Sequence, residues 1–420
     1  MFIHIVRQGD TLFKISRMYQ ASMERLRLAN GFGDSNLVIG QAVLIPKYTY
    51  IVQSGDTFIG IARKAMVSVE QLRQANPSIH PSSIHPGMKI KIPNISNYLA
   101  GTLEYYQVRT PEQDAELISQ FAPYSSSIAL FEYHFASNGD IVNNLNDAVA
   151  VRTTWEHRVV PLVTITNLTS QGFSSDLVSA VLNNPTARSN LVNNIVYLTK
   201  QHGYGGVNID FELVKAQDRD LLTGFLKELK VRLREDRLPI TIAVPAKSSE
   251  DISWLRGYDY GGIGSVVDYM FIMAYDWHHS GSEPGPVSPI TEVRKTIEYA
   301  IKTVPSRKII LGVPLYGYNW IIPYSSGRIA PGISNQDAIE TAMRYHAPIQ
   351  YSEEYQSPFF RYRDEQGQTH EVWFEDVRSM SAKMELVRNY GLQAIGAWQL
   401  SLGFAPGVWL LRKFFTIRKL

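Results

Sequence analysis

The distribution of apolar and polar residues changes near residue 99. Before that point, short apolar segments that read as strands flank pairs of amphipathic helical segments. After it, short apolar strands alternate with longer amphipathic helices to the end of the 420-residue chain. The two patterns predict a region of small domains followed by one large α/β domain.

The first hundred residues contain an internal repeat. VRQGDTLFKI at 6–15 recurs as VQSGDTFIGI at 52–61, and each unit reads strand, helix, helix, strand. The Gly-Asp-Thr turn puts Asp or Thr at the N-cap of the first helix, where a side-chain oxygen accepts a free backbone N–H. Later matches are Ala29-Asn30 with Ala75-Asn76 and Ile45-Pro46 with Ile92-Pro93.

This repeated pattern resembles the LysM module, a βααβ fold that binds glycans containing N-acetylglucosamine, such as peptidoglycan and chitin. The resemblance covers residues 2–47 and 49–94. A single Gly-Asp-Thr turn would indicate only a capped helix, whereas two copies with matching later positions favour the module. We therefore expect glycan-binding LysM domains at 1–47 and 48–96.

The remainder of the chain has the strand count of a TIM barrel. Roughly 320 residues with eight alternating strand and helix units are typical of a (β/α)₈ barrel. The gap between the last two strands is too long for one helix and predicts a small α+β insertion at about 321–375. We expect the barrel domain to span 99–420, with its site at the C-terminal ends of the strands. The strand candidates are 102–108, 127–134, 159–166, 205–212, 239–245, 268–275, 308–316 and 394–400.

Composition excludes several classes of site and partner. The chain has no cysteine, which excludes disulfides, thiolate metal sites and cysteine nucleophiles. Its formal net charge is only +2, so the chain lacks the excess of basic residues that is typical of a nucleic-acid-binding protein. No run of 18 apolar residues predicts a transmembrane helix, and the first residues lack the pattern of a secretory signal. We expect neither a nucleic acid nor a membrane as partner.

The segment GYGGVNIDFEL at 203–213 contains the candidate catalytic residues. In a strand, Asn208, Asp210 and Glu212 point to one face and their apolar neighbours to the other. Polar groups aimed into a barrel are costly unless they are hydrogen-bonded. Two close carboxylates do not both ionise cheaply, so one pKa rises, which prepares a general acid. A solvated edge strand, the alternative, is disfavoured by the apolar residues on the opposite face.

This segment resembles the active-site strand of glycoside hydrolase family 18, whose pattern is Asp-Gly-x-Asp-x-Asp-x-Glu. In that alignment Gly206 matches the glycine, Asp210 the last aspartate and Glu212 the catalytic acid. Gly205 and Asn208 replace the first two aspartates, and we expect Asn208 to keep its capacity to hydrogen-bond Asp210. These departures bear on the rate and the pH profile rather than on the reaction class. The resemblance implies neither a metal nor a cofactor.

Later segments resemble the same family. In MAYDW at 273–277, Tyr275 and Asp276 would contact the acetamido group of the reacting sugar. In GAWQLS at 396–401, Trp398 would form the apolar floor beneath that sugar, although a core tryptophan is the structural alternative. LGVPLYGYNW at 311–320 resembles strand seven, whereas TITN at 164–167 lacks the usual Ser-x-Gly-Gly. The substrate-binding residues implied by the resemblance are Asn208, Asp276, Asn319, Trp398 and Gln399.

The resemblance implies a retaining hydrolase with substrate assistance. Glu212 would protonate the glycosidic oxygen and later act as base, and the substrate's 2-acetamido oxygen would be the nucleophile. Asp210 and Tyr275 would complete the catalytic set by orienting and stabilising the acetamido group.

The arrangement of two LysM repeats, a GGxNIDFE strand and a late insertion resembles the spore cortex-lytic enzymes of endospore-forming bacteria, in particular the cortical fragment-lytic group. We therefore expect an N-acetylglucosaminidase that acts on peptidoglycan, in spore cortex fragments during germination. Such a protein would be monomeric and associated with the spore coat, the cortex or the cell wall. A LysM chitinase is an alternative function that would differ from this one only in its substrate. A second alternative is a non-catalytic glycan-binding coat protein. The presence of Glu212 disfavours it, because such a protein would lack the catalytic acid at this position.

Overall fold

A computed structural model describes residues 1–33 and 36–419 of the chain. In it, each repeat of the N-terminal region folds as two helices between a pair of antiparallel strands. The first pairs Phe2 with Ile45 and the second pairs Thr49 with Lys91, as the repeated strand pattern predicts. The elements are β1 (Phe2–Ile5), α1 (Leu12–Tyr19), α2 (Met23–Asn30), β2 (Ala42–Ile45), β3 (Thr49–Ile51), α3 (Phe58–Lys64), α4 (Val69–Ala75) and β4 (Lys89–Lys91).

The residues shared by the two repeats hold their fold together. Thr11 and Thr57, rather than the aspartates before them, are the N-caps of α1 and α3. The buried Asn30 ties its helix to the closing strand, because its Nδ2 donates to the Leu44 carbonyl and its Oδ1 accepts from the Leu44 N–H. Asn76 makes the equivalent bonds in the second repeat.

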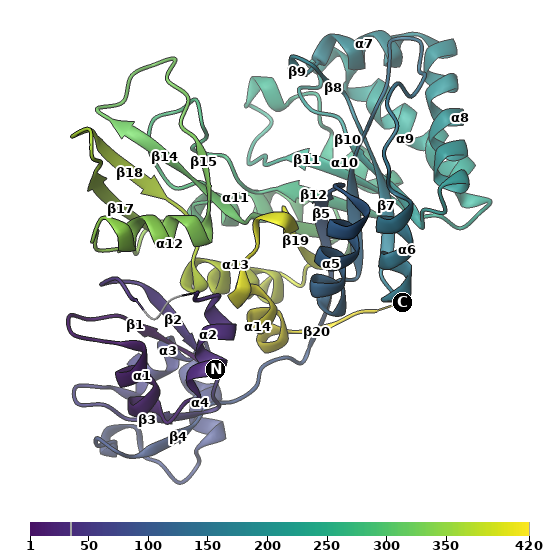
Figure 1. Cartoon of the computed structure of the whole chain (residues 1–420). Coiled ribbons are helices and arrows are strands. Elements are labelled where there is room, and N and C mark those ends of the chain that lie inside the picture. Colours follow the sequence, from purple (N-terminus) through teal and green to yellow (C-terminus); the bar gives the residue numbers. More distant parts are fainter. Residues whose placement is uncertain (34–35, 420) are drawn as a thin grey trace.

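The first repeat packs against the C-terminal helices of the barrel domain (Figure 1). Its residues Met1, Ile3 and Leu44 belong to the same buried apolar cluster as the barrel helices. Helix α2 contacts α14 (Ala405–Phe414), and strand β2 contacts α13 (Val377–Asn389). The Ile349 N–H also donates to the Ile39 carbonyl at 2.8 Å, which joins this repeat to the insertion.

Within the described part of the chain, eight parallel strands close into the predicted barrel, and the pairing of β19 with β5 completes the ring. The strands, in their order around the ring, are β5 (Tyr98–Gln107), β6 (Ser127–His134), β7 (Val160–Thr166), β10 (Gly206–Asp210), β11 (Ile240–Pro245), β12 (Tyr269–Met273), β13 (Ile309–Pro314) and β19 (Ala394–Trp398). A short strand, β20 (Phe415–Ile417), pairs with the start of β5.

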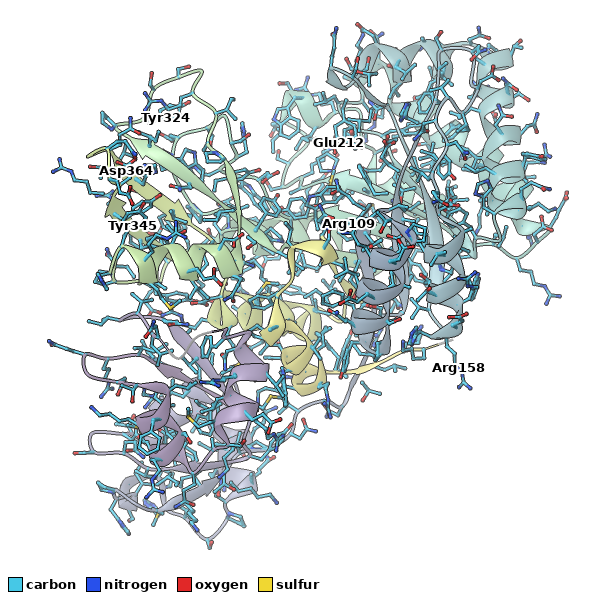
Figure 2. All side chains as sticks on the ribbon, viewed as in Figure 1. Arg109, Arg158, Glu212, Tyr324, Tyr345 and Asp364 are labelled. Atoms are coloured by element: carbon cyan, nitrogen blue, oxygen red, sulfur yellow. The ribbon has the colours of Figure 1, made fainter. Side chains whose placement is uncertain are left out.

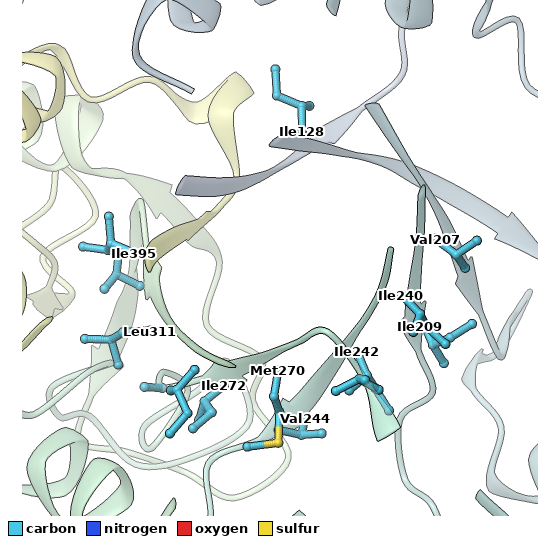
Figure 3. Close-up of a cluster of buried hydrophobic side chains, with 14 of the residues drawn as sticks. Ile128, Val207, Ile209, Ile240, Ile242, Val244, Met270, Ile272, Leu311 and Ile395 are labelled. Atoms are coloured by element: carbon cyan, nitrogen blue, oxygen red, sulfur yellow. The ribbon is translucent and has the colours of Figure 1, made fainter. Parts of the chain in front are cut away.

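The helices cover the outside of this ring. Apolar side chains on the outer face of the strands, such as Val207 and Ile209 of β10, pack beneath them (Figure 3). A second apolar cluster that includes Leu103 and Phe271 fills the interior. No helix in residues 1–33 and 36–419 combines the length and apolar character needed to cross a bilayer. The helices around the ring are α5 (Pro111–Phe121), α6 (Ala148–Glu156), α7 (Ser175–Asn183), α8 (Pro185–Gln201), α9 (Arg219–Arg234), α10 (Tyr260–Val266), α11 (Ile290–Ala300), α13 and α14.

The insertion lies between β13 and β19, as predicted, and forms an antiparallel sheet with a helix. It begins slightly earlier than expected, because Pro314 ends the parallel strand β13 and the chain enters β14 at Tyr316. Proline has no N–H with which to continue a ladder. The elements are β14 (Tyr316–Ile322), β15 (Gly332–Ser334), α12 (Asn335–Arg344), β16 (Gln350–Ser352), β17 (Ser357–Arg363) and β18 (Thr369–Trp373).

Candidate active site

A cleft of about 670 Å³ opens at the C-terminal ends of the barrel strands. Glu212, one of its lining residues, lies between the barrel helices and the inserted sheet in the view of Figure 2. Most of the other lining residues are aromatic or apolar, which suits the flat faces of sugar rings. The residues that line it include Tyr105, Phe131, Asp210, Glu212, Trp254, Tyr275, Asp276, Tyr316 and Trp398.

Asp210 and Glu212 form a carboxylate pair at the floor of this cleft. Asp210 is the last residue of β10 and is only 3% exposed, and Glu212 follows on the same face. Burial raises the pKa of both groups, and the charge of Asp210 raises the pKa of Glu212 further. The pair therefore retains a proton near neutral pH, and Glu212 can serve as a general acid.

The backbone at Glu212 is held by two residues that sequence reasoning missed as site residues. The Oδ1 of the buried Asn167 accepts a hydrogen bond from the Glu212 N–H, and its Nδ2 donates one to the Glu212 carbonyl, each at 2.8 Å. Tyr258 donates its hydroxyl to the Phe211 carbonyl at 2.8 Å. Asn167 ends the TITN segment, which the sequence marked only as a departure from the family pattern. These bonds fix the direction in which the Glu212 side chain leaves the strand.

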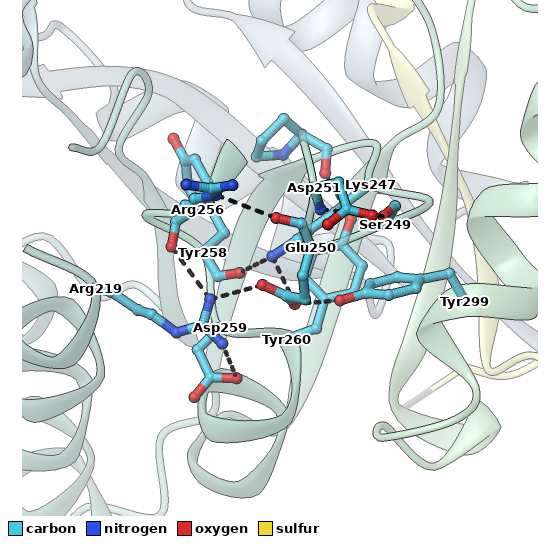
Figure 4. Close-up of polar contacts among 11 residues, drawn as sticks. Arg219, Lys247, Ser249, Glu250, Asp251, Arg256, Tyr258, Asp259, Tyr260 and Tyr299 are labelled. Atoms are coloured by element: carbon cyan, nitrogen blue, oxygen red, sulfur yellow. Dashed lines mark hydrogen bonds and ion pairs between the residues drawn. The ribbon is translucent and has the colours of Figure 1, made fainter. Parts of the chain in front are cut away.

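A polar network holds the loop after β11 that carries Tyr258 (Figure 4). The fully buried Lys247 donates to the Tyr258 carbonyl at 2.9 Å and pairs with Glu250 at 2.8 Å. Arg219 also pairs with Glu250, at 3.0 Å. Because a buried ammonium is costly without partners, this network resists rearrangement of the loop.

The same loop presents Trp254 to the cleft. Its side chain is 64% exposed although it is a large apolar group, and it lines the cavity beside the carboxylates. An exposed tryptophan fixed over a cleft is a ready stacking surface for a sugar ring. Trp254 has no motif around it in the sequence, so only the fold identifies it.

Asn208 lies inside the barrel, but its hydrogen bonds differ from those expected. Its Nδ2 donates to the Tyr105 hydroxyl at 2.9 Å, and its Oδ1 accepts from Thr241 at 2.8 Å. The structure gives it no bond to Asp210, whose Oδ1 is buried without a partner. The reason is geometric: Thr241 lies directly opposite Asn208 on the neighbouring strand β11 and Tyr105 reaches it across the barrel from β5, whereas Asp210 lies two residues further along β10.

Tyr275 and Asp276 follow β12 and both line the cleft. Burial raises the pKa of Tyr275 well above its usual range, so it remains a hydroxyl donor. Asp276 accepts hydrogen bonds from Tyr316 at 2.8 Å and Tyr318 at 3.2 Å. The two hydroxyls hold the Asp276 carboxylate at the side of the cleft formed by the insertion.

Trp398 lies in the cleft, whereas Gln399 does not line it. The Trp398 ring packs edge-to-face on Phe131, with centroids 4.9 Å apart, and remains partly exposed to the cavity. The Gln399 amide instead donates to Gln107 at 2.9 Å. Gln399 follows the last residue of β19, and its bond to Gln107 holds the amide at the end of β5, outside the lining of the cleft.

Asn319 lies outside the cleft, within β14 of the insertion. Its Nδ2 donates to the Tyr362 hydroxyl and its Oδ1 lies next to His370 Nδ1, both at 2.9 Å. These contacts give the amide a structural role in the inserted sheet. The position was predicted from the strand-seven pattern, but strand seven ends five residues earlier, at Pro314.

Comparison with known proteins agrees with this geometry. The family model described as Glycosyl hydrolases family 18 matches residues 107–403, and the LysM domain model matches residues 4–46 and 50–93. The chain is 68% identical over 419 residues to YdhD of Bacillus subtilis (strain 168), named as a sporulation-specific glycosylase, with 100% of both chains covered.

More distant relatives cover the whole chain as well. The cortical fragment-lytic enzyme of Bacillus subtilis (strain 168) is 37% identical, over 98% of this chain and 97% of that protein. The crystal structure of the Bacillus cereus spore cortex-lytic enzyme SleL has a TM-score of 0.90 at 30% identity and covers 99% of each chain. The chain therefore belongs to glycoside hydrolase family 18, as a glycosidase that carries two LysM domains ahead of its barrel.

Proposed function

We propose that the chain is an N-acetylglucosaminidase that cleaves the β-1,4 bond following N-acetylglucosamine in peptidoglycan. The observation that carries this proposal is the buried Asp210–Glu212 pair, with Tyr275 and Trp398 in the same cleft. The paired carboxylates lie two residues apart at the end of one strand and line the same cleft, so they do not flank a substrate from opposite sides as the two carboxylates of an inverting glycosidase do. This arrangement supports a nucleophile supplied by the substrate itself.

In the first step, Glu212 gives its proton to the glycosidic oxygen. The bond between C1 and that oxygen breaks as the carbonyl oxygen of the 2-acetamido group bonds to C1 and forms an oxazolinium ion. Asp210 accepts the acetamido N–H and stabilises the positive charge, and Tyr275 donates its hydroxyl to the acetamido oxygen. In the second step, the Glu212 carboxylate takes a proton from water, which attacks C1 and restores the acetamido group with net retention.

The choice of sugar follows from this nucleophile. N-acetylglucosamine carries a flexible 2-acetamido group, whereas a muramic δ-lactam ties its nitrogen into a ring and directs the carbonyl away from C1. A site that holds an acetamido group therefore favours N-acetylglucosamine in the reacting position. Because relatives are named for cortical fragments and the LysM module binds such glycans, fragments of spore cortex during germination are the proposed substrate.

The protein would act as a monomer attached to the spore coat, the cortex or the cell wall through its LysM domains. Digestion of cortex peptidoglycan, followed by borohydride reduction and mass spectrometry, tests the bond that is cut. We expect N-acetylglucosaminitol at the new ends. Reduced muramic products would contradict both the specificity and the nucleophile. Chitin oligomers digested in parallel would identify a chitinase if they were cleaved much faster than the cortex fragments.

A further inference from the structure

Strand β6 contains a bulge that places an additional carboxylate beside the catalytic pair. Along β6, Leu130 lies opposite Val163, but Tyr133 lies opposite Ile165, so two residues of β6 oppose the single Thr164 of β7. Those two residues are Phe131, which lines the cleft, and Glu132. A bulge can re-aim a side chain in this way.

The contacts of Glu132 show that it faces the barrel interior. The Thr166 hydroxyl donates to Glu132 Oε2 at 2.9 Å. Thr166 is fully buried and lies directly opposite Asp210 in the pairing of β7 with β10. Thr166 therefore stands between two carboxylates, Glu132 from β6 and Asp210 from β10. His134 Nδ1 lies 3.3 Å from the Glu132 carboxylate on its other side.

Asp210 has a free oxygen in this arrangement. Its Oδ1 is buried and has no hydrogen-bond partner, and the amide of Asn208 is bonded to Tyr105 and Thr241 instead. The negative charge of Glu132 adds to burial in raising the pKa of Asp210. The charge that the family pattern places at position 208 is thus absent, and a different carboxylate acts on Asp210.

The other ionisable groups around Asp210 come from several strands. Within the described residues, the lining of the cleft includes no lysine or arginine, and its histidine is His279. Among these described residues no lysine or arginine thus neutralises the carboxylates, and the nearby histidines are His279, which acts on Asp276, and His134, which lies against Glu132. The groups that interact with Asp210 are Glu212 on its own segment, Glu132 from β6, Tyr105 from β5, Tyr258 after β11 and Tyr275 after β12, whereas Asp276 acts on Glu212 and Tyr275.

We propose that Glu132 is a positioning residue for the reaction, which supplies from β6 the negative charge that Asn208 does not supply and acts through Asp210. This proposal rests on the proposed function, since it concerns the charge that meets the oxazolinium ion. With Glu132 behind it, the Asp210 anion has no favourable partner until the acetamido N–H and the positive charge of the intermediate arrive. The Glu132 charge therefore stabilises the intermediate more than the free enzyme, which is the condition for catalysis.

The test compares Glu132→Gln, Glu132→Asp and the wild-type protein. We expect Glu132→Gln to lower kcat on cortex fragments by about tenfold with little change in KM, as the loss of one nearby charge predicts. The acid limb of kcat/KM should move to lower pH by about one unit, because removal of a negative charge favours the ionised form of Asp210. Glu132→Asp keeps the charge and should restore part of both effects. Glu365→Gln, on the exposed hairpin of the insertion, is the matched control and should change neither.

A direct titration separates this proposal from the proposed function. Carboxyl ¹³C resonances of the free protein, with Asp210 assigned by an Asp210→Asn variant, should show Asp210 titrating at lower pH in Glu132→Gln. A fall in kcat with an unmoved acid limb and unmoved Asp210 titration would show that Glu132 only supports the bulge and would overturn the proposal. If the wild-type protein cleaved no glycan, the proposed function would fail, while the titration would still decide whether Glu132 acts on Asp210.

Discussion

Asn167 holds the peptide groups on both sides of Glu212, since its Oδ1 accepts the Glu212 N–H and its Nδ2 donates to the Glu212 carbonyl, each at 2.8 Å. Its Nδ2 also donates to the Ser174 carbonyl at 3.0 Å. One buried amide thus links the end of β7 to the catalytic strand and to the start of α7. The general acid is oriented by a residue that does not line the cleft itself.

Replacing Asn167 with alanine should therefore reduce activity and stability together. The Glu212 N–H and carbonyl would lose their partner, and each buried unpaired group costs about 1–3 kcal/mol. We expect a free energy of unfolding lower by about 2–3 kcal/mol and a kcat lower by about 10²-fold, with KM changed less. Urea denaturation and steady-state kinetics check the two effects, with Asn144→Ala, at an exposed position, as the control. An unchanged kcat would show that Asn167 does not orient Glu212.

The alternation of polar and apolar side chains along β10 and the number of strands in the barrel could be predicted from the sequence, because both follow from local periodicity. The roles of Asn167 and Glu132 could not, because they depend on the register between β6, β7 and β10 and on a bulge. Asn319 shows the opposite failure. A motif assigned it to the site, but it lies on the face of β14 opposite Tyr316 and Tyr318, whose hydroxyls bond Asp276, and its amide bonds within the inserted sheet.

Glu212→Gln tests the assignment of the general acid. The amide keeps the shape and hydrogen-bonding capacity of the side chain but has no acidic proton, so hydrolysis should fall by at least about 10²-fold. Binding to insoluble peptidoglycan, measured by sedimentation, should be retained. The control is Glu365→Gln, which makes the same chemical change on the exposed hairpin. Turnover above about 10% of wild type would argue that another group donates the proton.

Trp254→Ala tests the stacking surface at the cleft. Loss of an aromatic platform is worth about 1–1.5 kcal/mol, so KM for long glycan fragments should rise by about fivefold to tenfold. The kcat for a small aryl N-acetylglucosaminide should change little, because the variant leaves the carboxylate pair intact. Tyr197→Ala, which removes an exposed aromatic ring from α8, provides the control. Equal KM values for wild type and Trp254→Ala on long fragments would exclude a sugar contact.

Glu104 predicts a pH dependence of stability that is independent of the active site. It is 6% exposed between the barrel and its helices, its Oε2 has no partner, and burial raises its pKa to about 8. The folded state binds the Glu104 proton more tightly than the unfolded state does. The contribution of protonated Glu104 to the free energy of unfolding is therefore fully present below pH 4.5 and is lost as the pH rises towards 8. The nearby Lys419 charge offsets part of this loss.

Glu104→Gln should therefore be more stable than the wild-type protein at pH 8, by on the order of 2 kcal/mol, with the difference shrinking towards pH 5. Urea midpoints measured across that range for both proteins check the trend, and Glu365→Gln should show none. Activity should be unchanged, since Glu104 does not line the catalytic cleft. A constant difference at all pH values would indicate that packing, and not ionisation, separates the two proteins.

Removing residues 1–96 should weaken both binding to the wall and the stability of the barrel. The loss of binding follows from the loss of two linked glycan sites, whose avidity exceeds that of either alone. The loss of stability follows from the packing of Met1, Ile3 and Leu44 in the barrel's apolar cluster, because α13 and α14 would expose apolar surface.

We expect a lower midpoint of thermal unfolding and weaker sedimentation with peptidoglycan, while kcat on soluble fragments remains near the wild-type value. Leu44→Asp in the full chain is the companion variant. It places a charge in the buried cluster and should lower the midpoint while the second repeat keeps part of the wall binding. An unchanged midpoint in the truncated protein would show that the first repeat rests on the barrel without stabilising it. Equal sedimentation of the truncated and full-length proteins would place the wall-binding surface on the barrel instead.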